Sequence, residues 1–229
     1  MKKYLFILPI IIIITIYIHL KNNKNYLYQK NILVINTQSI SPVNKIEDKN
    51  TNYYIDIYYP NTIYQNLNKY IEDNLHIYIN NFIKETKENK NIPYSEFKLI
   101  ITYKEYTYNN YLSYLFHIFI DTRGAHPNTY IFTANYDKKT NKIIDINYLT
   151  KNYKNILNIF SEISRKTLED KKLKIPKDML LEGTTPKKEN FKSFIFSNSG
   201  IILLFERYSV APYSYGEFNV KIPYQSLQK

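Results

Sequence analysis

The chain has 229 residues, and 31 Lys and Arg against 20 Asp and Glu give it a formal net charge of +11. It has no cysteine, which excludes disulfides, thiol catalysis, iron–sulfur clusters and cysteine zinc sites. Asn, Lys, Ile and Tyr dominate, as AT-rich codons would supply, so we interpret the positive charge as a compositional background. Without a cluster of Lys and Arg on any one element, nucleic acid is disfavoured as a partner.

An apolar run from Tyr4 to Leu20 follows the two lysines near the start of the chain and ends at Lys21. About 17 residues make about 26 Å of helix, near the lower limit for crossing a hydrocarbon core of about 30 Å. The run lacks the small residues that precede a signal-peptide cleavage site. The sequence therefore predicts a transmembrane anchor over residues 1–21, which crosses a membrane through residues 4–20 and leaves the rest of the chain extracytoplasmic.

The next segments predict a tether, a strand and a helix. Residues 22–50 are polar, and we expect them to form a tether that contributes a possible first strand. Apolar and polar residues alternate from Tyr53 to Tyr59, which predicts a strand that ends at Pro60. Apolar residues then recur every three to four positions from Ile63 to Phe82, which predicts an amphipathic helix.

Most of the remaining chain alternates between strand and helix patterns. The run 112–120 is apolar at nearly every position, so we expect it in a central strand with both faces covered. The fold class is α+β, with antiparallel sheets packed against two main helices and preceded by one transmembrane helix. The predicted strands are 96–106, 111–121, 129–137, 143–146, 191–196, 201–206 and 217–222, and the second main helix is 151–170.

Residues that AT-rich codons do not favour gather in two segments. One is Arg123-Gly124-Ala125-His126-Pro127, and the other is Val210-Ala211-Pro212-Tyr213 followed by Gly216. Glycine tolerates positive φ angles and proline restricts φ, so both segments are interpreted as loops of defined shape.

Three motifs around these loops resemble a known extracytoplasmic domain family. They are Gly124–Thr129, Phe205–Tyr213 and Gly216–Tyr224. The family, of unknown function, is shared by the lysozyme-sensing anti-sigma factor RsiV and by the N-terminal region of the peptidoglycan deacetylase PdaC. The resemblance covers residues 51–229 and implies a PdaC-type α+β module at 51–122 and an RsiV-type domain at 123–229. It also implies partners in the cell wall or partners related to lysozyme.

The sequence departs from both namesakes where their activities reside. Only Met1 to Lys3 precede the predicted span, whereas RsiV has a cytoplasmic module there that holds a sigma factor. The paired aspartates and the His-x-x-x-His spacing of the metal-dependent PdaC deacetylase domain do not occur in this sequence. We therefore expect a membrane-anchored binding domain without catalysis, metal or cofactor.

The binding candidates lie in the two loops: Arg123, His126, Asn128, Tyr213 and Tyr215. A loop histidine can be presented to a ligand, but it can equally lock a turn by bonding backbone carbonyls. Exposed tyrosines can stack on sugar rings or anchor a protein partner, or they can cap a sheet edge.

The partner is expected to be a cell-wall polymer or a secreted or envelope protein. Lysozymes of animal origin are basic, so a basic domain would repel them at long range. Two alternatives stay open. One is an enzyme that acts on wall glycans through His126 with an acidic partner; Asp121 with Glu182 or Glu206 could in principle also pair as glycosidase carboxylates. The other is a structural envelope protein that binds a membrane protein.

Overall fold

The computed structural model describes residues 41–88 and 97–227, which belong to one compact unit, Ser39–Lys229. Within these residues no helix is both long and apolar enough to cross a membrane. The predicted anchor over residues 1–21 and the tether up to residue 40 lie outside the described residues. The anchor therefore stays a prediction.

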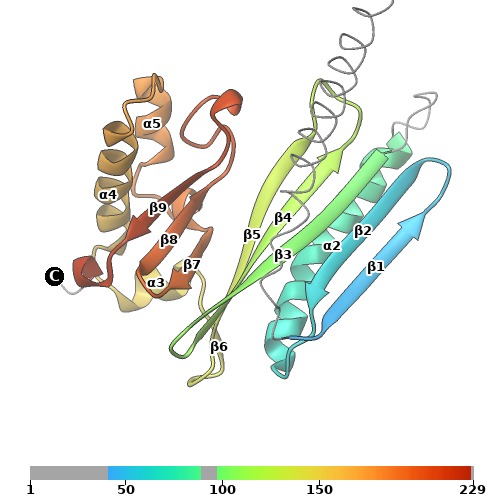
Figure 1. Cartoon of the computed structure of the whole chain (residues 1–229), viewed down its shortest axis with the longest axis horizontal. Coiled ribbons are helices and arrows are strands. Elements are labelled where there is room, and N and C mark those ends of the chain that lie inside the picture. Colours follow the sequence, from blue (N-terminus) through green and yellow to red (C-terminus); the bar gives the residue numbers. More distant parts are fainter. Residues whose placement is uncertain (1–40, 89–96, 228–229) are drawn as a thin grey trace, which may run out of the picture. The chain divides into compact units, whose positions relative to one another are not determined.

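A large six-stranded sheet forms the first half of the described chain, with its strands in sequence order (Figure 1). The predicted antiparallel meander is confirmed over β3, β4 and β5. The expectation of antiparallel pairing alone is wrong at β2 and β3, which run parallel because helix α2 crosses over between them. The strands are β1 (Val43–Lys49), β2 (Tyr53–Pro60), β3 (Phe97–Tyr108), β4 (Tyr111–Asp121), β5 (Asn128–Asp137) and β6 (Lys142–Ile143).

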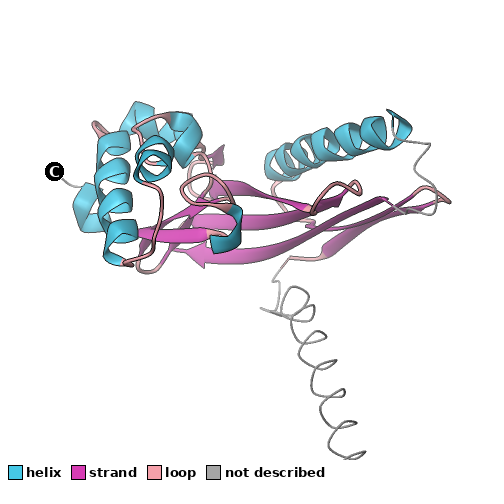
Figure 2. Ribbon diagram, turned by 90° about the horizontal axis from the view of Figure 1, so that it is seen from above, coloured by secondary structure: helices cyan, strands magenta, loops and turns pink. Residues whose placement is uncertain are grey.

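Helix α2 (Gln65–Glu88) covers one face of this sheet (Figure 2). Its buried stripe of Leu67, Ile71, Leu75 and Phe82 has the predicted helical spacing. Ile63, the first residue of the predicted stripe, lies before the helix and is 88% exposed. The stripe packs against inward residues of β2, β3, β4 and β5 in one apolar core.

A smaller antiparallel sheet is formed by β7 (Phe194–Ser197), β8 (Gly200–Phe205) and β9 (Phe218–Ile222). Alternate residues of its strands pack in a second core against α3 (Ile146–Asn152), α4 (Ile156–Asp170) and α5 (Lys177–Gly183). The predicted helix over 151–170 is thus two helices, because Asn155 has a left-handed φ of 60°. The predicted strand at 143–146 is also too long, since the Asp145 side chain accepts from the Tyr148 N–H and starts α3.

Two further corrections concern the end of the chain. Helix α5 has no counterpart among the predicted elements, and the strand predicted at 191–196 begins later, because residues 188–191 form a 3₁₀-helix. Two more 3₁₀-helices follow, Tyr213–Tyr215 and Tyr224–Leu227.

The two sheets meet at β4 and β5, as expected for a central strand with both faces covered. Leu115 and Ile131 of the large sheet pack against Ile195 and Leu204 of the small sheet. Three buried polar side chains of the large sheet form hydrogen bonds with backbone groups at the outer edge of β7. The N–H of Phe196 donates to Ser113 (3.1 Å), the N–H of Phe194 donates to Thr133 (3.3 Å), and Asn135 donates to the Phe194 carbonyl (2.8 Å).

The predicted boundary between two modules, at residues 122 and 123, falls in the loop between the paired strands β4 and β5. Residues on both sides of this boundary therefore contribute to one sheet. The division into two modules stays a prediction.

Candidate functional site

Two loops meet at one end of β5, and they contain the two segments singled out in the sequence. The first loop (residues 122–127) joins β4 to β5, and the second loop (residues 206–217) joins β8 to β9. The Tyr213 hydroxyl donates to the Pro127 carbonyl at 3.1 Å. The rings of His126 and Tyr213 are stacked, with centroids 4.2 Å apart and planes 28° apart. The fold thus joins residues that are more than 80 positions apart.

His126, Tyr208 and Tyr213 form an aromatic cluster. Tyr208 lies 5.4 Å from Tyr213 and 6.4 Å from His126 between ring centroids. Arg207 supports the cluster, because its guanidinium lies 4.5 Å from the Tyr213 ring centroid and donates to the Tyr213 carbonyl at 3.1 Å. Tyr213 is half-buried, whereas His126 is exposed and Tyr208 is 55% exposed. The accessible aromatic surface therefore belongs mainly to His126 and Tyr208.

The backbone of both loops enters the left-handed region, at Arg123 (φ 62°) and Tyr208 (φ 67°). The turn at Arg123 has a local support, since the Asp121 carboxylate accepts from the Arg123 N–H at 2.9 Å and lies 3.6 Å from its guanidinium. Tyr208 is an aromatic residue, for which this conformation is a steric outlier. The second loop therefore holds an exposed tyrosine in a strained conformation.

Gly183 of α5 fixes the position of the second loop. A Cβ atom at this residue would lie 1.8 Å from the carbonyl oxygen of Ser209 and 2.8 Å from the Val210 side chain. The close approach of α5 to the loop thus requires glycine at this position. Next to it, Ser209 donates its N–H (3.1 Å) and its hydroxyl (2.5 Å) to the Glu206 carbonyl and closes the turn that contains Tyr208.

The structure brings together His126 and Tyr213 of the five predicted binding residues. Arg123 lies in the first loop, where it pairs with Asp121. Asn128 is exposed and starts β5 opposite Ile120. Tyr215 donates its hydroxyl to the Lys174 carbonyl at 3.3 Å, away from the ring contacts of the cluster. A binding role for these five residues stays a prediction.

Sequence reasoning missed Arg207 and Tyr208 as site residues. Both lie inside the motif Phe205–Tyr213 that carried the family resemblance, so their position in the chain was a usable signal. Their side chains did not stand out, because the sequence contains 25 tyrosines.

The structure has one feature for each of the two interpretations of His126. Its Nδ1 lies 3.1 Å from the Pro127 carbonyl, as expected for a histidine that locks the turn. Its ring is exposed, as expected for a histidine presented to a ligand. Of the acidic candidates, Asp121 pairs with Arg123, and Glu206 accepts from the Ile131 N–H at 2.7 Å. In residues 41–88 and 97–227 we find no group of three or more metal-ligating side chains placed to hold an ion.

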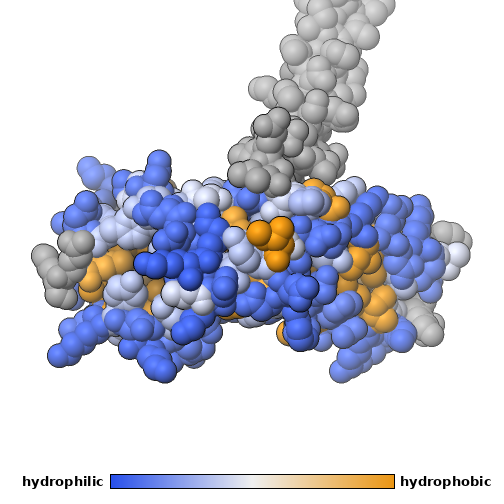
Figure 3. Space-filling model, turned by 90° about the horizontal axis from the view of Figure 1, so that it is seen from below, coloured by the Kyte–Doolittle hydropathy of each residue, from blue (hydrophilic) through white to orange (hydrophobic). Residues whose placement is uncertain are grey.

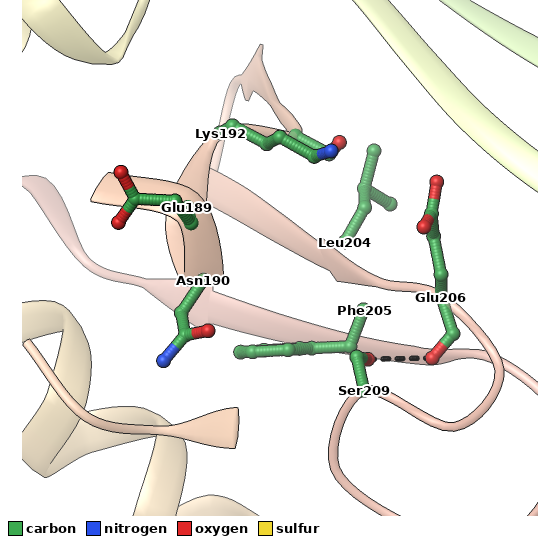
Figure 4. A pocket seen from close by; sticks show the side chains of 8 residues that line it. Glu189, Asn190, Lys192, Leu204, Phe205, Glu206 and Ser209 are labelled. Carbon is green, nitrogen blue, oxygen red and sulfur yellow. Dashed lines mark hydrogen bonds between the residues drawn. The ribbon is translucent and has the colours of Figure 1, made fainter. Parts of the chain in front are cut away.

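A shallow pocket with about 310 Å³ of empty volume lies between the 3₁₀-helix at 188–191 and β8 (Figure 4). Several groups in its wall already serve the fold. Asn190 donates to the Glu182 carbonyl (2.9 Å), and the Leu204 N–H donates to the Ser193 carbonyl (2.9 Å). The lining residues are Glu189, Asn190, Lys192, Ser193, Leu204, Phe205, Glu206 and Ser209.

Comparison with known proteins places the second loop and most of β5 within one family model. This model, described as a protein of unknown function (DUF3298), covers residues 131–225. Residues 131–225 match the DUF3298 family. Two solved structures of DUF3298 proteins have a similar fold. The one from Bacteroides fragilis NCTC 9343 has a TM-score of 0.52 at 16% identity and covers 82% of this chain and 92% of that chain. The one from Pseudomonas aeruginosa PAO1 has a TM-score of 0.54 at 15% identity and covers 83% and 94%.

A curated relative is the peptidoglycan-N-acetylmuramic acid deacetylase PdaC of Bacillus subtilis (strain 168). It is 37% identical over 100 residues, which make up 43% of this chain and 21% of PdaC. The chain thus matches about a fifth of the length of this relative. The similarity to PdaC that the motifs indicated is confirmed.

Proposed function

We propose that this chain is a membrane-anchored extracytoplasmic domain that binds a cell-wall polymer without catalysis, through the aromatic cluster. The similarity of its DUF3298 region to PdaC, a peptidoglycan deacetylase by name, supports the cell wall as the setting. The apolar run over residues 4–20 supports the membrane anchor. The observation that carries the binding role is the exposed Tyr208 in its left-handed conformation.

A left-handed conformation costs a residue other than glycine about 1–2 kcal/mol. Because Tyr208 is 55% exposed, burial of its side chain offsets only part of this cost, which Asn or Gly would avoid. The tyrosine side chain is therefore best explained by a contact with a ligand. Aromatic rings with one apolar face and one polar group are suited to ligands that are themselves amphipathic, as sugar rings are.

On the face shown in Figure 3, a large apolar protein interface has less support. The face shown in Figure 3 is mainly hydrophilic, and its hydrophobic residues lie in separate patches. Contiguous apolar patches are the usual mark of extensive protein docking surfaces. A secreted protein such as lysozyme remains the second candidate ligand from the family resemblance, and the net charge of +11 disfavours its basic forms.

The test is sedimentation of the full chain, in mild detergent, with purified peptidoglycan. We expect the wild type to sediment and the variant Tyr208→Asn to bind at least about tenfold more weakly, as for a residue central to an interface. Tyr153→Asn is the matched control, because Tyr153 is an exposed tyrosine (38%) outside both loops. Unchanged sedimentation of Tyr208→Asn would contradict the proposal. Release of soluble glycan that depends on His126 would instead support an enzyme.

A further inference from the structure

A pair of polar side chains, His117 and Glu217, connects β4 with the last residue of the second loop and takes no part in the aromatic cluster. His117 is on β4 opposite Ile131, and Glu217 immediately precedes β9. The His117 Nδ1 and the Glu217 Oε2 are 3.8 Å apart, which is too long for a hydrogen bond. The two side chains are 38% and 28% exposed. Each therefore keeps hydrogen-bonding capacity that a ligand can reach.

Arg207 connects this pair to the aromatic cluster. Its guanidinium stacks on Tyr213. Burial raises the pKa of the Glu217 carboxyl, and the positive charge of Arg207 opposes this rise. Arg207 itself and Thr129, which lies on β5 two residues from the strand partner of His117, have further unused polar atoms. The Nε of Arg207 and the Oγ1 of Thr129 are buried and have no hydrogen-bond partner among the described residues. Such atoms commonly indicate a missing water or ligand.

The charges around the pair restrict the ligand. An anionic group would face the Glu217 carboxylate, and a cationic group would face Arg207 and also Lys104, whose charge acts on His117. Burial, followed by the charge of Lys104, lowers the pKa of His117, so the imidazole is neutral at pH 7 and offers one donor and one acceptor. An uncharged hydroxyl or amide group meets these requirements, since it can donate to Glu217 and accept from His117.

We propose that His117 and Glu217 form a hydrogen-bonding subsite next to the aromatic cluster, which selects an uncharged, N-acetylated sugar unit of the glycan. This inference rests on the proposed function and specifies the ligand class. Stacking on Tyr208 and His126 would hold the face of one sugar ring. His117 and Glu217 would form hydrogen bonds with hydroxyl or acetamido groups of the same sugar unit or the next one. Removal of acetyl groups exposes amines, which are cationic, and thus weakens binding at this subsite.

The experiment is calorimetric titration of the full chain, in mild detergent, with a tetramer of N-acetylglucosamine and with the same tetramer after de-N-acetylation. A glycerol-phosphate polymer is the anionic probe. We expect the acetylated tetramer to bind most tightly. Glu217→Gln and His117→Gln should each weaken its binding about five- to tenfold, the usual effect of one lost hydrogen bond to a ligand. Glu162→Gln, on the exposed surface of α4, is the control, and near-UV circular dichroism reports whether each variant is folded.

The outcomes separate the two proposals. If both subsite variants are folded and bind the acetylated tetramer like the wild type, while Tyr208→Asn loses binding, the subsite is wrong and the proposed function stands. Tighter binding of the de-N-acetylated tetramer or of the phosphate polymer also overturns the subsite. If the wild type binds neither tetramer, phosphate polymer nor peptidoglycan, both proposals fail.

Discussion

The variant Tyr208→Gly separates a structural role of Tyr208 from a binding role. Glycine adopts the observed φ of 67° without strain, which returns about 1–2 kcal/mol to the folded state. Against this, loss of the ring contact with Tyr213 at 5.4 Å costs about 0.5–1.5 kcal/mol. The extra freedom of glycine in the unfolded chain costs about 0.5–1 kcal/mol. Because 55% of the residue is exposed, less than half of its surface is buried, and loss of this burial costs about 1 kcal/mol more.

The losses exceed the relief of strain slightly, so we expect the free energy of unfolding of Tyr208→Gly to fall by only about 1 kcal/mol relative to the wild type. Binding to peptidoglycan should fall at least about tenfold. The assay is urea unfolding followed by circular dichroism, combined with sedimentation on the same preparations. A loss of stability of more than about 2 kcal/mol would show that the side chain holds the second loop in place. The argument from backbone strain to a ligand would then be refuted.

Three further predictions concern stability. Gly183→Ala should destabilise the fold by about 3 kcal/mol in urea unfolding, because its Cβ would lie 1.8 Å from the Ser209 carbonyl oxygen; unchanged stability would show that α5 moves freely. Ser113→Ala should cost about 2 kcal/mol by leaving the buried Phe196 N–H unpaired, whereas the exposed Ser214→Ala should cost almost nothing. His117 has a folded pKa below its ordinary value of 6.5, so its contribution to stability is lost as pH falls from 6.5 through the lowered pKa. His117→Gln should therefore lose less stability than the wild type between pH 7 and pH 5, and equal losses would contradict this assignment.

Elements with strong periodicity were predictable because their pattern reports burial directly. Strand β2 alternates from Tyr53 to Tyr59, helix α2 has an apolar stripe, and β4 is apolar on both faces, and all three occur where the sequence placed them. The parallel pairing of β2 with β3 has no such local signal. It depends on the end of the sheet to which α2 returns the chain.

The region between β6 and β7 was less predictable because short elements carry weak patterns. The predicted helix over 151–170 joined the end of α3 to α4, but the two helices are separated by residues 153–155, where Tyr153 is extended and Asn155 has a positive φ. Helix α5 has only seven residues, and it is held by packing, including the close approach of Gly183 to the second loop. Tertiary contacts outweigh local propensity in such segments.

The sequence by itself located both loops, since their Gly, Pro and His residues stand out against the Asn, Lys, Ile and Tyr background. It also determined the hydrophobic patterns of the main elements and the similarity to PdaC. Only the tertiary structure decided that His126 meets Tyr213 and that Arg207 and Tyr208 complete the cluster. The physical reason is that packing of the small sheet on β4 and β5 brings together loops distant in the chain, and side-chain patterns do not encode that distance.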